Sequence, residues 1–498
     1  MFPTSSIQNL VELLPNTNDI AIITPTNQSI SFMDLRHKIG KFAGGLQQLG
    51  VQPGARVVIL VPMSIDLYVA LLATLWIDAT VMLIDPSAPL DSILPKFQPD
   101  VFIASGKAHL LRFRYASLRA CTLQIATNWT ILPHKRLHNI QATPPPISTP
   151  QHPALLTFTT GTTGVPKAMA RSHSFLLCQH QALKHHMNYT AKHVDLPTLP
   201  VFLLHSLAAG ATCVLPNANL QRVDSVDPSL VLTQITQHNI HSMSGSPAFF
   251  LPFIEQYATK PISGVRQIFT GGARVNAKIA TGLCTTFPQA EIYIVYGSTE
   301  AEPIAVCHVN SNLSLLCEGE SKGIGALVGR PVPEIQIWIR DQEILVTGNH
   351  VNQSYYQDSK SDAENKVHHE GKIWHRTGDA GFIDDDGNLW LLGRIGDAVQ
   401  GIWPVTIESR AECVDFVRKA AFVEHRGAGL LVLELEKGYS TKTLSPIDKQ
   451  TIENIFSNTR FVDHIPVDPR HNSKIDRKQL HKILEKHSNY KQHKISNL

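Results

Sequence analysis

The stretch "TTGTTGVPK" (residues 159–167) combines residue types that bind anions. Its glycines let the backbone approach a ligand closely, and its threonine hydroxyls and Lys167 supply hydrogen-bond donors and a cation. A series of backbone N–H groups after a strand forms a cradle for phosphate. Gly161, Gly164 and Lys167 are each three residues apart, so the spacing excludes the G-x-x-x-x-G-K-[ST] loop. The stretch indicates a different phosphate loop, with an ordinary Thr/Gly turn as the alternative.

Further motifs carry groups that suit the other parts of a nucleotide. "YGSTE" (296–300) offers an aromatic face, a hydroxyl and the carboxylate of Glu300, which suit base stacking, phosphate contact and a Mg²⁺ ligand. "TGGA" (270–273) is a tight loop where backbone can meet a purine. Glu300 could instead be a residue near the start of a helix.

Three later motifs supply charged groups. "HRTGD" (375–379) ends in Asp379, a carboxylate suited to ribose hydroxyls, and "GRIGD" (393–397) adds Arg394 as a second polar ligand. "NSKIDR" (472–477) places Lys474 among small and polar residues. The alternatives are that Asp379 is a hairpin-turn residue and that Lys474 is a solvated surface lysine.

Strands alternating with helices must position these motifs. The apolar segment 57–85 is interrupted by Pro62, Asp66 and Asp78, so it does not resemble a membrane span. It predicts a βαβ unit with a strand at Val57–Val61, a helix at Ser64–Trp76 and a strand at Thr80–Ile84. Several motif loops follow such apolar strands directly, which predicts an α/β fold with a ligand crevice at the strands' carboxyl ends.

Composition shifts predict the domain organisation. The Pro-rich segment 141–153 predicts a crossover within a large domain, residues 1–394. From about 338 to 394, short strands with turn signals such as Asp386-Gly387 predict a β subdomain. Residues 398–498 are expected to form a small α+β domain that carries Lys474.

Composition also excludes several classes of protein. A formal charge of +3 over 498 residues provides no global field for a nucleic-acid partner. The seven cysteines are scattered, without a C-x-x-C pair, which is typical of reduced thiols in the cytoplasm. The N-terminus lacks the features of a signal peptide. The histidine pairs 185–186 and 368–369 lack zinc spacing and are expected on the surface. We expect a cytoplasmic protein without a transmembrane segment.

Taken in this order, the motifs resemble those of the adenylate-forming superfamily, which contains acyl-CoA synthetases, peptide-synthetase adenylation domains and luciferases. The resemblance covers nearly the whole chain, up to Lys474. "KAHLLR" (107–112), "DLPTLPVF" (195–202), "GSPAFF" (245–250), "WHRTGD" (374–379) and "PVDPRHN" (466–472) further resemble the branch of fatty acyl-CoA ligase-like β-lactone synthetases of bacterial olefin biosynthesis. That branch implies partner enzymes of a lipid pathway.

The resemblance implies that a carboxylate reacts with ATP in the presence of Mg²⁺, giving acyl-AMP and pyrophosphate. It implies that residues 1–394 bind ATP and the acyl group, that residues 395–397 form a hinge, and that the small domain is mobile and brings in Lys474 by closure about Gly396. It also implies that Thr299 contacts the α-phosphate and that Glu300 binds Mg²⁺. The other ATP and AMP ligands that it implies are Thr159, Thr160, Gly161, Thr162, Thr163, Gly164 and Lys167 for the phosphates, Gly271, Gly272, Ala273, Tyr296 and Gly297 near the adenine, and Asp379 and Arg394 for the ribose.

Two departures from the family pattern concern the phosphate loop and the acceptor of the acyl group. Ala168 stands where relatives usually have glycine after the lysine, a small change. The segment "VQGIWPVTIE" (399–408) is about two residues shorter than the loop that helps form the pantetheine tunnel in thioester-forming relatives. The short loop disfavours coenzyme A and favours attack by an internal 3-hydroxyl group, which would close a β-lactone.

Two alternatives stay open: a conventional acyl-CoA ligase, and a catalytically inactive ATP-binding scaffold. Retention of Lys167, Glu300, Asp379, Arg394 and Lys474 counts against the scaffold.

The substrate pocket is expected near residues 200–250. Apolar residues such as Phe202, Phe249 and Phe250 favour a fatty or 3-hydroxy fatty acid over an amino acid. His205 either lines this pocket or is a hydrogen-bonded core histidine. The sequence leaves chain length, stereochemistry and oligomeric state open.

Overall fold

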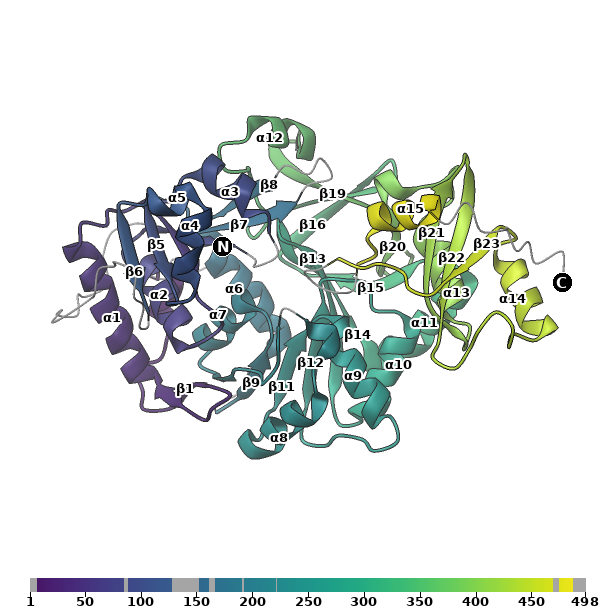
Figure 1. Cartoon of the computed structure of the whole chain (residues 1–498), viewed down its shortest axis with the longest axis horizontal. Coiled ribbons are helices and arrows are strands. Elements are labelled where there is room, and N and C mark those ends of the chain that lie inside the picture. The colour runs from purple at the N-terminus through teal and green to yellow at the C-terminus, as the bar shows by residue number, and fades with distance from the viewer. Residues whose placement is uncertain are drawn as a thin grey trace.

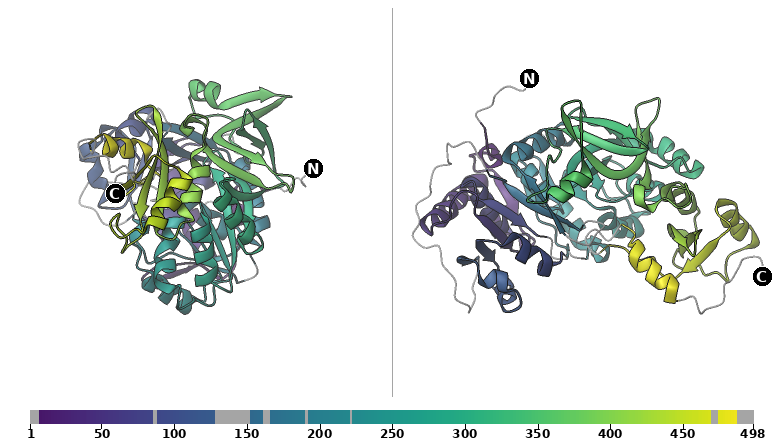
Figure 2. Two further views of the ribbon diagram at one scale, coloured as in Figure 1. Left: turned by 90° about the vertical axis from the view of Figure 1, so that its right-hand side faces the viewer. Right: turned by 90° about the horizontal axis from the view of Figure 1, so that it is seen from above.

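The computed structural model describes residues 7–84, 88–127, 152–160, 166–189, 192–220, 222–468 and 474–486. Its ribbon shows a large α/β body and a smaller unit at one end that contains the C-terminal part of the chain (Figure 1). Seen from above, this smaller unit extends away from the large body (Figure 2). The predicted α/β class with a separate small C-terminal domain is confirmed. Most of the predicted crossover 141–153 lies outside the described residues.

A six-stranded sheet in the order β6-β5-β3-β4-β7-β8 forms one part of the large body. Its strands are β3 (Arg56–Leu60), β4 (Thr80–Leu83), β5 (Val101–Ala104), β6 (Leu123–Ala126), β7 (Leu155–Thr160) and β8 (Pro166–Arg171). All neighbours are parallel except β7 and β8, which pair antiparallel on either side of the predicted phosphate loop.

The predicted βαβ unit is confirmed within this sheet. Helix α2 (Ile65–Trp76) joins β3 to the parallel strand β4. The helix begins one residue after the predicted start because Ser64 is its N-cap, with the hydroxyl accepting the Leu67 N–H at 3.3 Å. Every residue of α2 from Leu67 onward is buried, which explains why the segment is as apolar as a membrane span without being one.

A larger sheet runs through the rest of the large body in the order β16-β17-β19-β20-β15-β14-β13-β12-β11-β9-β10-β1-β2, with β18 paired to β19. Its strands are β1 (Ile20–Ile23), β2 (Ser29–Ser31), β9 (Val194–Pro197), β10 (Thr212–Val214), β11 (Ser242–Gly245), β12 (Gln267–Gly271), β13 (Glu291–Ser298), β14 (Ala301–His308), β15 (Ala326–Pro331), β16 (Ile335–Arg340), β17 (Glu343–Gly348), β18 (Lys366–His369), β19 (Lys372–Ile383) and β20 (Leu389–Arg394). Neighbouring strands are parallel from β1 through β10, β9, β11 and β12 to β13. From β13 through β14, β15, β20, β19 and β17 to β16, neighbouring strands are antiparallel.

Helices cover these sheets and connect their strands (Figure 1). Those of the large body are α1 (Phe32–Gln48), α3 (Leu90–Phe97), α4 (Leu111–Arg114), α5 (Ala116–Arg119), α6 (His173–Met187), α7 (Pro200–Ala208), α8 (Pro228–His238), α9 (Pro247–Tyr257), α10 (Ala277–Thr286), α11 (Val309–Lys322) and α12 (Ser359–Asn365). Short 3-10 helices lie at Leu10–Leu13, Ala108–Leu110, Val223–Ser225 and Ile395–Asp397.

The small domain contains a three-stranded sheet in the order β21-β22-β23 and three helices. Its elements are β21 (Val417–His425), β22 (Ala428–Leu435), β23 (Thr459–Val462), α13 (Pro404–Glu412), α14 (Pro446–Ile455) and α15 (Arg477–Lys486). Both ribbon views place α15 on the side of the small domain that faces the large body (Figures 1 and 2).

Two interpretations left open by the sequence are wrong. Asp379 is not a hairpin-turn residue, because it lies inside the twelve-residue strand β19, opposite Arg394 of β20. Glu300 is not near the start of a helix, because it lies in the tight connection between the antiparallel strands β13 and β14.

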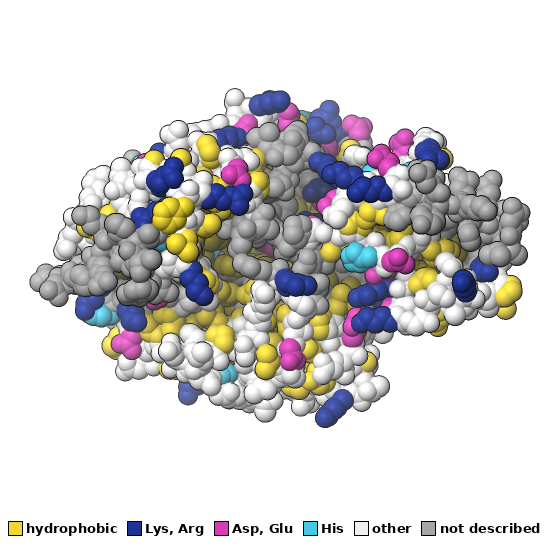
Figure 3. Space-filling model, viewed as in Figure 1, with side chains coloured by type: hydrophobic (Ala, Val, Ile, Leu, Met, Phe, Trp, Pro, Cys, Tyr) yellow, Lys and Arg dark blue, Asp and Glu magenta, His cyan; other side chains and the backbone are white. Residues whose placement is uncertain are grey.

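Side-chain chemistry at the surface agrees with the composition. The seven cysteines are all unpaired. On the described part of the face drawn in Figure 3, Lys and Arg side chains lie interspersed with Asp and Glu. Of the histidine pairs expected on the surface, His185, His368 and His369 are exposed, whereas His186 is half-buried. The described residues contain no group of three or more His, Cys, Asp and Glu that could by itself hold a metal ion, and no helix among them has the length and apolarity to cross a membrane.

Candidate active site

Tyr296, Asp379 and Arg394, which are far apart in the sequence, meet at one point of the larger sheet. The Tyr296 hydroxyl donates to Oδ2 of Asp379 at 2.7 Å. Arg394 Nη1 lies 3.1 Å from Oδ1 of Asp379 and donates to the Thr377 carbonyl at 2.6 Å. The neighbouring carboxylate raises the pKa of Arg394. The arrangement presents an aromatic ring beside a carboxylate whose two oxygens are held in place.

Glu300 lies at the end of β13, with its side chain oriented by Tyr355. The Tyr355 hydroxyl donates to Oε1 of Glu300 at 3.0 Å, and the Asn352 N–H donates to the Glu300 carbonyl at 2.7 Å. Burial would raise the pKa of Glu300, but His375, the Tyr355 hydroxyl and Lys366 outweigh burial and lower it. Glu300 is therefore an anion at neutral pH, as a ligand for a hard cation must be.

Lys167, the lysine of the predicted phosphate loop, lies against the same tyrosine. Its Nζ is 5.5 Å from the centre of the Tyr355 ring and 3.8 Å from Oε2 of Glu364 on α12. Tyr355 pairs with Met169 of β8 through an isolated bridge, so the strand after the loop holds the ring in position. The ring thus connects Lys167 to Glu300.

Lys366 is a buried cation near Glu300 that our motif analysis missed. Its Nζ donates to the Asn352 carbonyl, lies 3.3 Å from Nδ1 of His375 and is 5.3 Å from the centre of the Tyr355 ring. Burial lowers the pKa of Lys366 to about 8, and burial together with this lysine lowers the pKa of His375 to about 4. Nothing in the local pattern "ENKVHH" distinguishes Lys366 from a surface lysine; only its position in β18 beside β19 does.

Thr299, the predicted α-phosphate contact, is braced by Arg171. Arg171 Nη2 donates to the Thr299 carbonyl at 3.0 Å, and its side chain is only 3% exposed. Gln179 of α6 donates to the carbonyl of Glu302, three residues after Thr299, at 3.1 Å. These buried contacts join β8 and α6 to the β13–β14 connection and so fix the backbone on which Thr299 and Glu300 stand.

The loop predicted to meet a purine follows β12. Gly271 pairs with Val295, and a Cβ on Gly271 would lie 2.3 Å from the Val295 carbonyl oxygen, so only glycine fits. Gly272 has φ of +79°, a conformation that favours glycine. A Cβ on Gly297 would likewise lie 2.8 Å from the Ala301 carbonyl oxygen. Ala273 completes the loop, which lies beside the end of β13.

Polar atoms without partners mark the same edge of the sheet. Among the described residues, the hydroxyls of Thr270 and Ser298 are buried without a hydrogen-bond partner. They stand at the carboxyl ends of the adjacent parallel strands β12 and β13. Buried polar groups in proteins are nearly always hydrogen-bonded, so unpaired ones at this edge are suited to a polar ligand.

The centre of the phosphate loop, Gly161 to Gly164 including Thr162 and Thr163, lies outside the described residues. Its two ends are described: Thr159 pairs with Lys167 and Thr160 with Pro166 across β7 and β8. The antiparallel pair therefore closes the base of the loop.

Lys474 and Gly396 belong to the C-terminal part of the chain. Lys474 is exposed, and its N–H and carbonyl both bond to Asp468, at 2.9 Å and 2.8 Å. Gly396 is exposed within the 3-10 helix Ile395–Asp397, and a Cβ there would have no atom within 4 Å. Neither steric crowding nor a positive φ requires glycine in this arrangement, so the hinge role of Gly396 stays a prediction.

Contacts that hold the small domain begin directly after the loop 270–273. The side chain of Arg274 forms an ion pair with Glu412 of α13, and Asn276 Nδ2 donates to the same carboxylate at 2.9 Å. Lys278 Nζ donates to the carbonyls of Val414 and Val417 at 2.9 Å and 2.7 Å. Residues that follow the loop 270–273 therefore contact the small domain directly.

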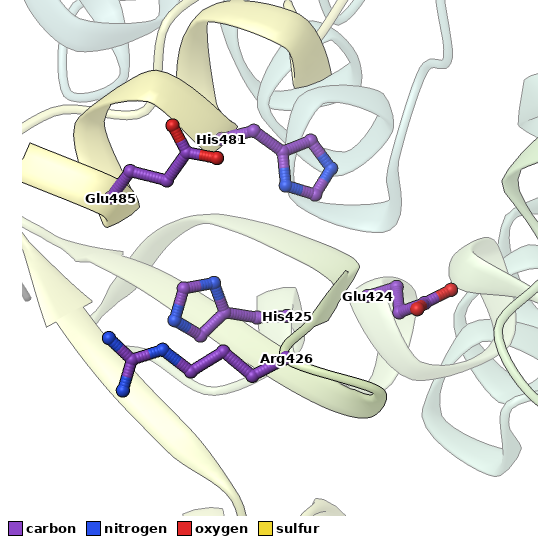
Figure 4. A pocket seen from close by; sticks show the side chains of 5 residues that line it. All are labelled: Glu424, His425, Arg426, His481 and Glu485. Atoms are coloured by element: carbon purple, nitrogen blue, oxygen red, sulfur yellow. The ribbon is translucent and has the colours of Figure 1, made fainter.

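A separate pocket lies within the small domain. It is lined by Glu424, His425, Arg426, His481 and Glu485. Figure 4 shows His481 and Glu485 on α15 facing His425 and Arg426 on the β21–β22 hairpin. None of the predicted site residues lines this pocket, and its acidic and basic groups offset each other, so we do not place the reaction there.

The residues around the ends of β12 and β13 and around Asp379 of β19 fit a nucleotide with a divalent cation. They provide unpaired hydroxyls for hydrogen bonds, glycines that leave space for a base, the oriented carboxylate of Asp379 and an ionised glutamate. When bound, Mg²⁺ would supply charge neutralisation at the phosphates from Glu300.

Comparison with known proteins agrees with this geometry. The olefin β-lactone synthetase of Stenotrophomonas maltophilia is 27% identical over 91% of this chain and 90% of its own length. 4-Coumarate–CoA ligase 2 of Nicotiana tabacum is 24% identical over 92% of this chain and 90% of its own length. The structure of an amide bond synthetase from Marinactinospora thermotolerans has the same fold, with a TM-score of 0.79 and 19% identity over 95% of this chain and 98% of that one.

A family model described as AMP-binding enzyme matches residues 14–356, well over half of the chain. The chain therefore belongs to the family of AMP-binding, adenylate-forming enzymes.

Proposed function

We propose that the protein activates a fatty or 3-hydroxy fatty acid as acyl-AMP and then closes a β-lactone on the internal hydroxyl. In the first step a carboxylate oxygen attacks the α-phosphorus of ATP, and pyrophosphate leaves with the electron pair of the broken P–O bond. In the second step the 3-hydroxyl oxygen attacks the acyl carbon, AMP leaves and one proton is released. The observation that carries the first step is the assembly of Tyr296, Asp379, Arg394 and Glu300 where the end of β13 meets β19 and β20.

Each polar group has a role in the first step that follows from its chemistry. Asp379 accepts hydrogen bonds from the ribose hydroxyls, with Arg394 fixing its second oxygen. Thr299 donates to the α-phosphate, and Lys167 neutralises the outer phosphates. Lys474, brought in by closure of the small domain, stabilises the charge that develops between two reacting anions.

A cluster of buried apolar side chains supports a fatty substrate. Leu183, Met187, Phe202, Phe269 and Val295 form a cluster between α6, α7, β12 and β13. Of the aromatic residues singled out from sequence, Phe202 belongs to this cluster, whereas Phe249 and Phe250 pack in the separate core around α9. The cluster offers no charged partner for the head group of an amino acid.

The loop after the hinge supports an acceptor other than coenzyme A. Val399 and Ile402 exchange both backbone hydrogen bonds, at 3.0 Å and 2.9 Å, around Gln400 and Gly401, which have φ of +51° and +79°. This is the tightest hairpin turn that a chain can make. The Trp403 indole N–H then donates to Gln342 of the large body at 2.9 Å. The relative from Stenotrophomonas maltophilia, named an olefin β-lactone synthetase, is consistent with an internal acceptor.

Product analysis tests both steps. The protein is incubated with ATP, Mg²⁺ and matched pairs of unsubstituted and 3-hydroxy fatty acids, with and without coenzyme A, and products are identified by mass spectrometry. We expect AMP and a β-lactone from the hydroxy acid without coenzyme A. Coenzyme A-dependent thioester without lactone would instead establish the acyl-CoA ligase. The absence of pyrophosphate exchange with every acid tested would establish the ATP-binding scaffold.

A further inference from the structure

Two buried histidines lie side by side next to the apolar cluster. His180 of α6 and His205 of α7 have ring centres 5.7 Å apart and ring planes inclined by only 12°. His180 precedes Leu183 of the cluster by three residues on α6, and His205 follows Phe202 of the cluster by three residues on α7. Residues three apart share a helix face. The histidine pair therefore lies one helical turn beyond the cluster.

Hydrogen bonds near His180 join this end of α6 to the β13–β14 connection. Gln179, next to His180 in the sequence, donates to the Glu302 carbonyl at 3.1 Å. Arg171, which donates to the Thr299 carbonyl at 3.0 Å, also donates to Gln179 at 3.4 Å. Along α6, His180 therefore lies between Leu183 of the apolar cluster and Gln179, which bonds to the connection that carries Thr299 and Glu300.

Three of the four imidazole nitrogens of this pair have no hydrogen-bond partner among the described residues. His180 and His205 are 3% and 2% exposed. Among the described residues, neither ring nitrogen of His205 and not Nδ1 of His180 has a hydrogen-bond partner. A buried polar group left unpaired costs about 1–3 kcal/mol, and native proteins rarely retain one without a reason. Two such rings in contact indicate that a polar ligand group completes them.

The charge state of the rings restricts which group that is. Burial lowers the pKa of both histidines, that of His180 to about 4, with Lys184 and Arg171 adding to the effect. Both rings are therefore neutral at physiological pH, and each has one N–H donor and one acceptor nitrogen. A hydroxyl group both donates and accepts a hydrogen bond, whereas a carboxylate only accepts and an ammonium only donates. A neutral imidazole pair is complementary to a hydroxyl.

We propose that His180 and His205 bind the 3-hydroxyl group of the acyl substrate. The proposal rests on the proposed function and narrows its substrate class to hydroxylated acids. The hydroxyl lies two carbons from the carboxyl carbon, and His180 lies on α6 between the apolar cluster and the residue that bonds to the connection carrying Thr299. The histidines orient the hydroxyl and thereby select the acid that can form a lactone.

The ratio of activities on matched acids tests the proposal. Initial rates of pyrophosphate release are measured for wild type, His205→Leu, His205→Gln and His180→Leu with 3-hydroxydecanoate and decanoate and with longer pairs. Because a lost hydrogen bond to a buried group costs about 1–3 kcal/mol, we expect His205→Leu to lower kcat/KM for the hydroxy acid about tenfold or more. The value for the unsubstituted acid should change by less than about twofold. His205→Gln keeps a donor and an acceptor and should retain part of the preference.

His109→Leu is the matched control, because His109 is also fully buried but its Nε2 donates to the Ile125 carbonyl at 3.0 Å in the six-stranded sheet. It should leave the ratio unchanged. Equal loss on both acids in His205→Leu and His180→Leu, or an unchanged ratio in both, would overturn the assignment while leaving the adenylation reaction intact. A wild-type protein that releases no pyrophosphate with any acid would overturn the proposed function, and this assignment with it.

Discussion

Glu320 offers a test of the electrostatics at the junction of the two domains. This residue of α11 is 1% exposed; its Oε2 accepts the Ala277 N–H at 2.8 Å, and its Oε1 lies 3.5 Å from Arg274 without a hydrogen bond. Burial raises the pKa of Glu320 from 4.5 to about 7, because Arg274 and the Ala277 N–H only partly offset the loss of solvent. The substitution Glu320→Gln tests this pKa, because the neutral glutamine side chain resembles the protonated acid.

The size of the effect follows from proton linkage. An acid whose pKa is raised in the folded state binds more protons there than in the unfolded chain, so stability is lost as pH rises through about 7. At about 1.4 kcal/mol per pKa unit, the full cost of ionising Glu320 is about 3 kcal/mol. We expect Glu320→Gln to be more stable than wild type by about 1 kcal/mol at pH 5 and about 3 kcal/mol at pH 8.

The assay is urea unfolding of both proteins at pH 5 and pH 8. Glu318→Gln is the control, since Glu318 lies on the exposed side of the same helix and its pairing with Lys322 lowers its pKa. A lowered pKa stabilises the folded state once the pH is above the pKa of the same group in the unfolded chain. Glu318→Gln should therefore gain no stability relative to wild type between pH 5 and pH 8. A Glu320→Gln protein that is less stable than wild type at pH 8 would refute the reasoning, because the pairing with Arg274 would then outweigh burial.

Three further predictions concern the site and the hinge. Asp379→Asn should raise KM for ATP about tenfold or more, because it weakens the anchor between Tyr296 and the ribose; an unchanged KM in steady-state kinetics would contradict the ribose assignment. Lys474→Ala should lower ATP–pyrophosphate exchange about 10²- to 10³-fold, as loss of a transition-state contact does, with the unfolding temperature unchanged since the side chain is exposed; full exchange would count against a catalytic role. Gly396→Pro should slow turnover while leaving unfolding unchanged, because proline restricts φ at an uncrowded position; normal turnover would remove Gly396 from the hinge.

Motifs formed by residues close in sequence were predictable. The spacing of glycines, threonines and lysine in residues 159–167, and the carboxylates that follow apolar strands, are local patterns with a local physical meaning. The βαβ unit was predictable for the same reason: apolar runs of strand and helix length, separated by turn residues, can be buried together in few ways. The capping by Ser64 displaced only the start of its helix.

Tertiary contacts decided what the local patterns left open. Asp379 has the residue type of a turn, but its pairing with Arg394 across β19 and β20 places it in a strand. Arg171 supports Thr299 from 128 residues away, and Tyr355 joins Lys167 to Glu300. These supporting residues belong to no sequence motif, because a lone arginine or tyrosine is also what a surface or a core contains.

The amino-acid sequence by itself determined the α/β class, the order of the nucleotide motifs and the family resemblance, since each depends on short patterns of hydrophobicity, backbone freedom and charge. Only the tertiary structure decided which side chains surround Glu300, which cations lose water beside it, and that His180 and His205 come together. Strand order and helix packing bring such residues into contact, and burial then changes their charge states. The spacing of residues along the chain does not show which of them come into contact or become buried.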